Sequence, residues 1–294
     1  MKLRALAPAK VNLCLFLGPG RADGRHELVT LYESLTLHDE LQLETLDVGP
    51  DRVICPEIQG GNLAAQALRA LRATGWAGPP VEISIRKRIP VAAGMAGGSA
   101  DAAAALRLAI ELAPVRPDLL DVLAAELGSD VPAQLSPGLA LGTGAGEVLE
   151  RPSPLAPHAL LVVPLPAELS TPAVYREADR LGLPRSSDEL RDRHRRLRDA
   201  LQPGARLPDE LLVNDLQPAA VSLCPPVGEA LTRVHEAGAP HVIVSGSGPT
   251  VVGLWWGADA RAQAQRVAET LRSRYPRAQS AGPVEASAGR PHPV

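Results

Sequence analysis

Residues 89 to 104 read Ile-Pro-Val-Ala-Ala-Gly-Met-Ala-Gly-Gly-Ser-Ala-Asp-Ala-Ala-Ala, a glycine-rich turn that leads into an alanine-rich run. Before the turn, Val81 to Ile89 alternates apolar and polar side chains as a strand does, with Lys and Arg on its outward face. After the turn, Ser99 to Leu112 has the composition of a long helix. The stretch therefore predicts a strand, a turn and a helix in direct succession.

The glycines suit this turn to binding an anion. Without a Cβ they let the backbone point its amides at an approaching phosphate, and the start of the helix adds positive potential. We therefore predict a phosphate-binding loop made of Pro90, Val91, Ala92, Ala93, Gly94, Met95, Ala96, Gly97, Gly98, Ser99 and Ala100. The spacing fits neither the Walker loop nor the dinucleotide-binding glycine pattern, and a turn that only allows close packing is the alternative.

Two polar residues follow the glycines. Ser99 could cap the helix with its hydroxyl, or offer that oxygen to a phosphate or to Mg²⁺. Asp101 lies in the first helical turn, where an acid favours the helix dipole but would repel a triphosphate. We expect the Asp101 side chain to point away from the ligand and to be structural.

The first strand-like segment, Pro8 to Leu17, alternates with a period of two. Lys10 and Asn12 share one face of it, whereas the opposite face is purely aliphatic. Asp23-Gly24 signals a turn, and residues 28–44 return as extended sequence, so we expect an antiparallel pair.

Helical patterns cover Asn62 to Thr74 and Asp118 to Leu127. The stretch Ser186 to Asp209 is dense in mixed charge, and a solvated helix is favoured there over an anion site. Prolines become frequent at residues 151–158, which suits a crossing between domains. We predict domains over 1–155 and 156–286, and a disordered tail over 287–294.

Composition narrows the class of protein. The 294 residues with 45% hydrophobic content can bury the cores of two domains. A net charge of −3 argues against a nucleic-acid or membrane partner and favours a small molecule. Three widely spaced cysteines indicate neither disulfides nor zinc and fit a reducing cytoplasm, and no stretch is long and apolar enough for a membrane span. We expect a cytoplasmic monomer or weak homodimer.

Three separated motifs together carry a resemblance to a known family. They are Pro8-Ala-Lys-Val-Asn-Leu, Gly94-Met-Ala-Gly-Gly-Ser-Ala-Asp-Ala-Ala and Ser245-Gly-Ser-Gly-Pro-Thr, and in this order they resemble the signature regions of the GHMP kinases. The resemblance implies an α+β fold of two α/β domains: an N-terminal ATP-binding domain like a ribosomal-protein module and a ferredoxin-like C-terminal domain, with the active site between them.

Three further stretches, Arg21-Ala-Asp-Gly-Arg-His, Gly128-Ser-Asp-Val-Pro and Asn214-Asp-Leu, resemble the branch that phosphorylates a cytidine-diphosphate-linked methylerythritol. That branch transfers the γ-phosphate of ATP, with Mg²⁺, to the 2-hydroxyl of the erythritol unit in the non-mevalonate route to isoprenoid precursors. The resemblance assigns an aspartate base and a lysine to Asp130 and Lys10. From local sequence alone, a helix cap is the favoured role for Asp130, and a surface strand lysine is the alternative for Lys10.

Lys10 and Asn12 would then orient the acceptor hydroxyl and stabilise the charge of Asp130. For the cytidine, the resemblance assigns the cytosine edge to His26 and one ring face to Tyr175, which could otherwise be a half-buried core aromatic. Arg25 stands where the family commonly has tyrosine, and an Arg plane can also stack on a base.

The remaining assignments come from matching positions in the family. Asn62 and Lys87 are assigned to the adenine pocket. Ala96 and Ala100 replace the more usual glycine and serine, which restricts φ at one position and removes a hydroxyl at the other.

Gly246, Ser247 and Gly248 should bring backbone close to the phosphates or the acceptor, unless they form a simple turn between strands. Asn214 and Asp215 are expected to order the domain interface. A mevalonate or homoserine kinase and a non-catalytic nucleotide sensor remain the alternatives; the Asp-Gly-Arg-His loop argues against the former, and the retention of Lys10 and Asp130 against the latter.

Overall fold

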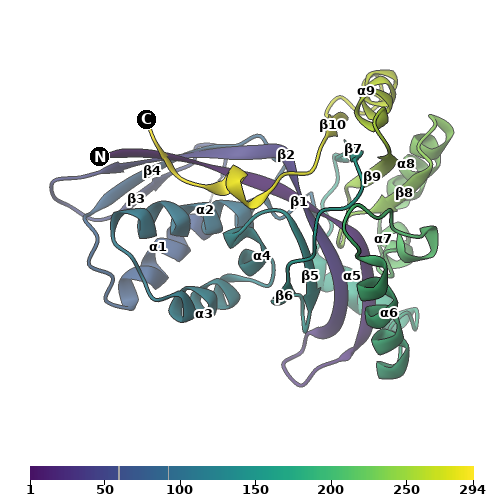
Figure 1. Ribbon diagram of the computed structural model, residues 1–294, viewed down its shortest axis with the longest axis horizontal. Helices are drawn as coiled ribbons and strands as arrows, with labels where there is room; N and C mark the ends of the chain where they lie inside the picture. The colour runs from purple at the N-terminus through teal and green to yellow at the C-terminus, as the bar shows by residue number, and fades with distance from the viewer. Residues whose placement is uncertain (59, 92) are drawn as a thin grey trace.

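Two long antiparallel strands, β1 (Lys2–Gly20) and β2 (His26–Thr45), run through the larger sheet of the molecule (Figure 1). The computed structural model describes residues 1–58, 60–91 and 93–294. The other strands of this sheet are β3 (Arg52–Ile54), β4 (Val81–Arg86), β5 (Leu139–Thr143), β6 (Val148–Glu150) and β11 (His292–Pro293). Over the described residues the order is β11-β1-β2-β4-β3, with β5 beside β2 and β6 beside β5, so the predicted antiparallel pair is confirmed.

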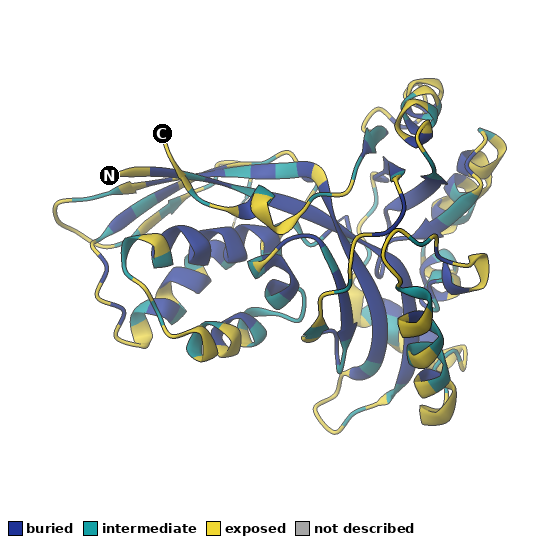
Figure 2. Ribbon diagram, viewed as in Figure 1, coloured by how far each residue is buried: buried dark blue, intermediate teal, exposed yellow. Residues whose placement is uncertain are grey.

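Helices cover one face of the larger sheet (Figure 1). They are α1 (Leu63–Ala73), α2 (Gly97–Leu112), α3 (Pro117–Leu127) and α4 (Val131–Leu135). α2 lies centrally, in contact with β1, α1 and α4, and its residues 100–109 are all buried (Figure 2). Its many alanines allow this close approach, because a methyl side chain keeps neighbouring backbones near one another.

The second half of the chain forms its own antiparallel sheet in the order β10-β7-β9-β8. Its strands are β7 (His158–Val163), β8 (His241–Val244), β9 (Val251–Trp256) and β10 (Gln279–Ala281). Its helices are α5 (Thr171–Arg180), α6 (Ser187–Ala200), α7 (Gln217–Leu223), α8 (Pro225–Glu236) and α9 (Ala260–Leu271). α8 and α9 pack on this sheet, whereas α6 contacts β1 and β2 of the larger one.

The aliphatic face of β1 joins the two halves. Leu15 and Leu17 are buried in one cluster with Val174 of α5 and Ala219 of α7. The main chain adds a parallel bridge between Leu15 and Asn214. The larger sheet is therefore packed on both faces at this end, and the second half is held against β1 by side chains and backbone together.

Three predicted elements have different limits from those expected. β4 ends at Arg86, so Lys87 belongs to the following loop and does not lie on an outward strand face. α2 begins at Gly97, two residues before the predicted start. α6 ends at Ala200, although its capping box between Ser186 and Glu189 supports the predicted solvated helix.

The C-terminal tail corrects another prediction, because the structure pairs residues that were expected to be disordered. A short 3-10 turn (Ala286–Gly289) leads into β11, which pairs antiparallel with β1, Leu3 lying opposite Pro293. Main-chain hydrogen bonds hold this segment, and such bonds leave no apolar periodicity in the sequence. In the part of the chain that is described, no helix is both long and apolar enough to cross a membrane.

Candidate active site

A cavity of about 540 Å³ lies where the two halves meet. β1, the glycine-rich loop, the start of α4, α5 and the loop after β8 all contribute to its wall. The predicted site residues in this wall are Lys10, Asn12, Asn62, Lys87, Pro90, Val91, Ala93, Gly94, Met95, Ala96, Gly97, Gly98, Asp130, Tyr175, Gly246, Ser247 and Gly248. As far as the structure describes it, the wall does not include Arg25, His26, Ser99 or Ala100. Ala92 lies outside the described residues.

The glycines of the loop serve different purposes. At Gly94 φ is +74°, and a Cβ would lie 2.6 Å from the carbonyl oxygen of Gly248, so close packing requires glycine there. The Thr250 hydroxyl donates to the Ala93 carbonyl at 2.5 Å and ties the same two loops together. At Gly98 a Cβ would meet no atom of the described residues within 4 Å, which leaves space for a ligand. Packing and ligand access are thus divided between different glycines.

The start of α2 is uncapped by any described side chain. Ala96 occupies the N-cap position with a left-handed φ of +52°, which costs an alanine about 1 kcal/mol. The first amides of the helix therefore remain free for a ligand. Of the two alternatives for Ser99, capping the helix is wrong, because α2 starts earlier and Ser99 is its third residue. With Ala100, it lies in the first turn and outside the cavity wall.

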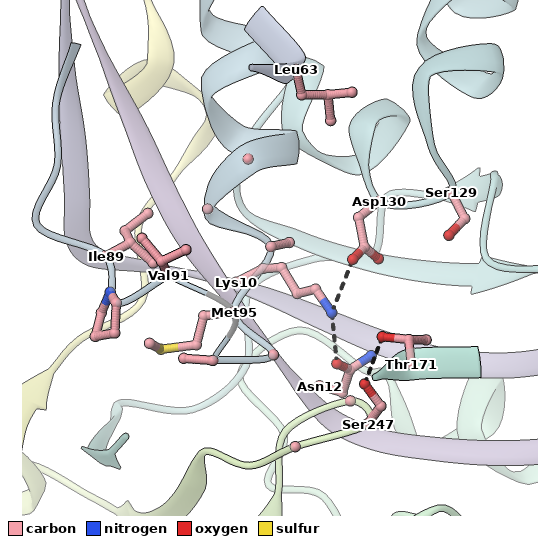
Figure 3. Close-up of a pocket in the computed structure, with 18 of the residues that line it drawn as sticks. Lys10, Asn12, Leu63, Ile89, Val91, Met95, Ser129, Asp130, Thr171 and Ser247 are labelled. Atoms are coloured by element: carbon pink, nitrogen blue, oxygen red, sulfur yellow. Dashed lines mark hydrogen bonds and ion pairs between the residues drawn. The ribbon is translucent and has the colours of Figure 1, made fainter. Parts of the chain in front are cut away.

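Lys10 is the centre of a polar group on β1 (Figure 3). Its ammonium donates to Asn12 Oδ1 at 2.9 Å and lies 3.4 Å from Asp130 Oδ2. Asn12 in turn donates to the Thr30 hydroxyl at 2.7 Å, and that hydroxyl donates to the Cys14 carbonyl. Lys10 and Asn12 are both buried and share a face as predicted, so Lys10 is not a surface lysine.

Asp130 occupies the N-cap position of α4, yet its side chain makes no capping hydrogen bond. The carboxylate instead extends toward the Lys10 ammonium, with the side chain about one-third exposed to the cavity. Asp130 therefore occupies the N-cap position that local sequence indicates. Its side chain, however, contacts Lys10, as the family resemblance implies. A carboxylate that faces the cavity and is held by one cation can accept a proton from a bound hydroxyl.

Tyr32 is a wall residue that the sequence analysis missed. It lies opposite Asn12 in the β1–β2 register, and Lys10 Nζ is 5.3 Å from its ring centroid. Burial, followed by the negative charge of Asp130, raises the pKa of the Tyr32 phenol well above its ordinary value. A Cβ at Gly146 would collide with the Tyr32 hydroxyl. Only the pairing of Asn12 with Tyr32 between β1 and β2 could have placed Tyr32 in the site.

Asn214 holds the loop that follows β8. It is buried, and its amide nitrogen donates to the carbonyl oxygens of Val244 and Gly246, both at 2.7 Å. Its Oδ1 accepts from the Leu216 amide at 2.9 Å. The Asp215 amide donates to the Leu15 carbonyl of β1. The predicted role of Asn214-Asp215 in ordering the interface between the halves is confirmed.

The same loop also contacts α5 directly. The hydroxyls of Thr171, the first residue of α5, and Ser247 are 2.9 Å apart, and both line the cavity (Figure 3). Gly246 has a φ of +55°, and a Cβ there would lie 3.3 Å from Asn12 Oδ1. This backbone therefore lies against the Lys10 group, in closer contact than a simple strand-to-strand turn would require.

The residues assigned to cytidine lie at the edge of the site. Tyr175 lines the cavity, and its ring centroid is 5.4 Å from that of His26. His26 Nε2 is 2.8 Å from Asp179 Oδ1, while its buried Nδ1 has no hydrogen-bond partner among the described residues. Arg25 Nε donates to Asp23 Oδ2 at 3.0 Å, which holds the guanidinium at the turn.

Asn62 and Lys87 both line the cavity, as expected for an adenine pocket, but each has a further partner. Asn62 caps α1, its Oδ1 accepting from the Ala64 amide at 2.8 Å. The Lys87 ammonium contacts the carboxylates of Asp39 and Asp101. Asp101 directs its carboxylate to Lys87, which agrees with its predicted structural role, but it also lines the cavity, which the expectation that it points away from the ligand did not include. Contact of either residue with adenine stays a prediction.

The residues present offer Mg²⁺ little direct ligation. No group of three or more His, Cys, Asp or Glu side chains that could hold a metal occurs within residues 1–58, 60–91 and 93–294. Ser99, the predicted ligand, is outside the cavity wall, and Asp130 is paired with Lys10. Substrate phosphates and water usually supply most Mg²⁺ ligands in kinases. The ion stays a prediction, with no protein ligand assigned.

Comparison with known proteins establishes the class. The family model described as GHMP kinases N terminal domain matches residues 62–138, and the one described as GHMP kinases C terminal matches residues 190–277. A Streptomyces avermitilis relative is 42% identical over 93% of this chain and 95% of its own length. The chain belongs to the GHMP kinase family, and the predicted two-domain fold of mixed helices and sheets is confirmed.

The relatives also agree on one activity within that family. The Streptomyces avermitilis protein is named 4-diphosphocytidyl-2-C-methyl-D-erythritol kinase, as is a Rhodococcus jostii protein that is 43% identical over 86% of this chain and 84% of its own. A crystal structure of 4-(cytidine 5′-diphospho)-2C-methyl-D-erythritol kinase has a TM-score of 0.74 and 34% identity, covering 96% of this chain and all of the other. An L. major mevalonate kinase, at 16% identity and a TM-score of 0.69 over 96% of each chain, shares the fold alone.

Proposed function

We propose that this chain transfers the γ-phosphoryl group of ATP to the 2-hydroxyl of 4-(cytidine 5′-diphospho)-2-C-methyl-D-erythritol, giving the 2-phosphate and ADP in the methylerythritol phosphate route to isoprenoid precursors. The relatives named for this kinase match nearly the whole chain. The observation that carries the chemistry is the Lys10–Asp130 pair, at 3.4 Å, in the same cavity as the free start of α2.

The base in this proposal is Asp130. Its carboxylate takes the proton of the 2-hydroxyl while the hydroxyl oxygen forms a bond to the γ-phosphorus. The bond from that phosphorus to the β–γ bridging oxygen breaks, and ADP leaves with the electron pair. Lys10 holds the carboxylate and the incoming oxygen in place, and Asn12 fixes the ammonium at 2.9 Å. Most of the rate enhancement then comes from positioning and charge stabilisation.

The phosphates of ATP bind at the start of α2. The amides of Gly97 and Gly98 lie in the first turn, where no intrahelical partner is available and the helix dipole favours negative charge. Open space beside Gly98 supports this placement. Mg²⁺, when bound with the nucleotide, supplies neutralisation of the phosphate charge. The Gly246–Gly248 segment faces the acceptor side of the cavity, close to Asn12.

For cytidine we propose Tyr175 as the stacking residue, because it lies in the cavity wall beside the His26 ring. Nδ1 of His26 has no hydrogen-bond partner among the described residues, whereas Nε2 is engaged by Asp179. Because Nδ1 is buried and His26 is outside the cavity wall, its contact with the cytosine edge requires neighbouring side chains to move. Arg25 could cover the base only after release from Asp23. The tyrosine more usual in the family at position 25 would have no such competing carboxylate contact.

We further propose that the domains span residues 1–155 and 156–286. We also propose that the protein is cytoplasmic and is a monomer or a weak homodimer. The larger sheet's strand β6 ends at Glu150 and the smaller sheet begins at His158, which supports a boundary there. A net charge of −3 supports a small-molecule partner over nucleic acid or a membrane surface.

ADP release tests the function. Purified protein is mixed with Mg-ATP and, in separate reactions, the cytidine-diphosphate methylerythritol, methylerythritol phosphate, mevalonate or homoserine. Turnover with the cytidylylated compound alone is expected. Turnover only with mevalonate or homoserine would keep the family and overturn the substrate, whereas ATP binding without turnover on any compound would favour a nucleotide sensor.

A further inference from the structure

A buried charge cluster lies behind the phosphate loop. Asp39, Lys87 and Asp101 have side-chain exposures of 0%, 7% and 4%. Lys87 Nζ donates to Asp101 Oδ2 at 2.6 Å and also to Asp39 Oδ2. Two carboxylates thus share one ammonium in a region with little water, an arrangement that is costly unless each group has partners.

The cluster joins two elements that precede the phosphate loop in sequence to the helix that follows it. Asp39 lies on β2, Lys87 directly follows β4, and Asp101 is in the second turn of α2. Asp39 Oδ1 accepts from the main-chain amides of Arg88 and Ile89, the latter at 2.8 Å. Asp39 therefore holds the backbone directly before the phosphate loop, and it reaches the residue directly after the loop, Asp101, through Lys87.

The cluster also borders the ligand space. Lys87 and Asp101 both line the cavity, and Lys87 Nζ would be 3.4 Å from a Cβ at Gly97, the first residue of α2. Asp101 Oδ1 is buried and has no hydrogen-bond partner within residues 1–58, 60–91 and 93–294. Burial lowers the pKa of Lys87, but the charges of Asp101 and Asp39 outweigh it and raise that pKa overall. The ammonium is accordingly bound to these acids in the free protein.

We propose that Asp39 is a positioning residue for ATP: through Lys87 and Asp101 it holds the two ends of the phosphate loop at the separation that leaves the first amides of α2 open to the phosphates. The proposal rests on the proposed function, because it takes the loop to be the ATP-phosphate site. It gives the Lys87 side chain a task in loop geometry, independent of any contact with adenine.

Asp39→Asn isolates this role. The amide oxygen of asparagine can still accept from the loop backbone, but its NH₂ group would face the Lys87 ammonium, donor against donor. The charged contact is lost while the shape is kept. Loss of a hydrogen bond to a charged group typically changes an equilibrium constant about tenfold. We therefore expect the Kd of a non-hydrolysable ATP analogue and the KM for ATP both to rise about tenfold. The KM for the phosphoryl acceptor should stay within about twofold.

Two further variants separate positioning from general stability. Asp101→Asn keeps an acceptor for Lys87 and removes one of two like charges, so it should fold normally and raise the analogue Kd by about threefold. Asp51→Asn is the matched control: Asp51 also accepts from a cation, Arg72, and from a main-chain amide, that of Val81, but it is not in the cavity wall. It should lower Tm without changing the analogue Kd.

Isothermal titration of each folded variant with the analogue, together with both KM values, tests the proposal. It is supported by a selective loss of ATP affinity in Asp39→Asn. Wild-type affinity for the analogue in Asp39→Asn, or equal rises in the KM for ATP and the KM for the acceptor in that variant, would overturn it. A wild-type chain that did not bind the analogue would overturn the proposed function as well, so the two failures are distinguishable.

Discussion

Replacing Asn214 by alanine should loosen the loop that follows β8, which lies against the Lys10 group in the active site. Asn214 is 4% exposed, and its side chain makes three hydrogen bonds of 2.7, 2.7 and 2.9 Å to main-chain groups. Each such bond contributes about 1 kcal/mol net, and a buried group left without a partner costs somewhat more, so Asn214→Ala should lower the free energy of unfolding by about 3–4 kcal/mol. Alanine leaves all three main-chain groups without that partner.

Denaturant unfolding measures this loss, and Gln217→Ala is its control. Gln217 Oε1 accepts one hydrogen bond, from the Val244 amide at 3.0 Å, so its removal should cost about 1 kcal/mol. Because Asn214 holds the Gly246 carbonyl beside the Lys10 group, the acceptor KM should also rise in Asn214→Ala and not in the control. Equal losses of about 1 kcal/mol in both variants, with unchanged KM, would refute the reasoning.

Three further predictions concern single positions. Ala96→Gly should raise the free energy of unfolding by about 0.5–1 kcal/mol in denaturant titrations, because glycine adopts φ +52° without the cost paid by alanine; a loss of stability would contradict this. Tyr175→Ala should raise the KM for the cytidylylated substrate more than the KM for ATP, and an unchanged substrate KM would remove Tyr175 from the stacking role. Burial raises the pKa of Asp101 from 3.8 to about 7; the positive charge of Lys87 opposes this rise, and the negative charge of Asp39 adds to it. Between these two pH values the folded chain therefore retains a proton that the unfolded chain releases. The free energy of unfolding should therefore fall as pH rises from about 4 to 7, and the fall should be shallower in Asp101→Asn; equal slopes would exclude Asp101 as its source.

Residues that act through short local patterns were predictable from the sequence. The glycine-rich turn between a strand and a helix is a local signal, and the structure places Gly97 and Gly98 at the uncapped start of α2. The alternation in β1 was enough to put Lys10 and Asn12 on one face. Asp130 required the family resemblance, because its local sequence indicates only a helix cap.

Contacts that depend on pairing distant segments were not predictable in the same way. Tyr32 enters the site through the β1–β2 register, and Asp39 meets Lys87 only because β2 and β4 are neighbours. β11 is held by backbone hydrogen bonds, which leave no mark on the pattern of side chains. Ser99 was misplaced for a different reason: the helix starts at a left-handed alanine, a conformation that sequence propensity disfavours.

Turnover of Asp130→Asn tests the central claim most directly. Single-turnover transfer from Mg-ATP to the cytidine-diphosphate methylerythritol would be compared with the wild type and with Asp118→Asn, a surface control in α3 whose side chain is 70% exposed. Loss of a general base predicts a fall of about 10²–10⁴-fold in the Asp130 variant, with the Kd for ATP within about twofold of the wild-type value. An asparagine variant that transfers phosphate at a rate within about threefold of the wild type would contradict the assignment of Asp130 as the base.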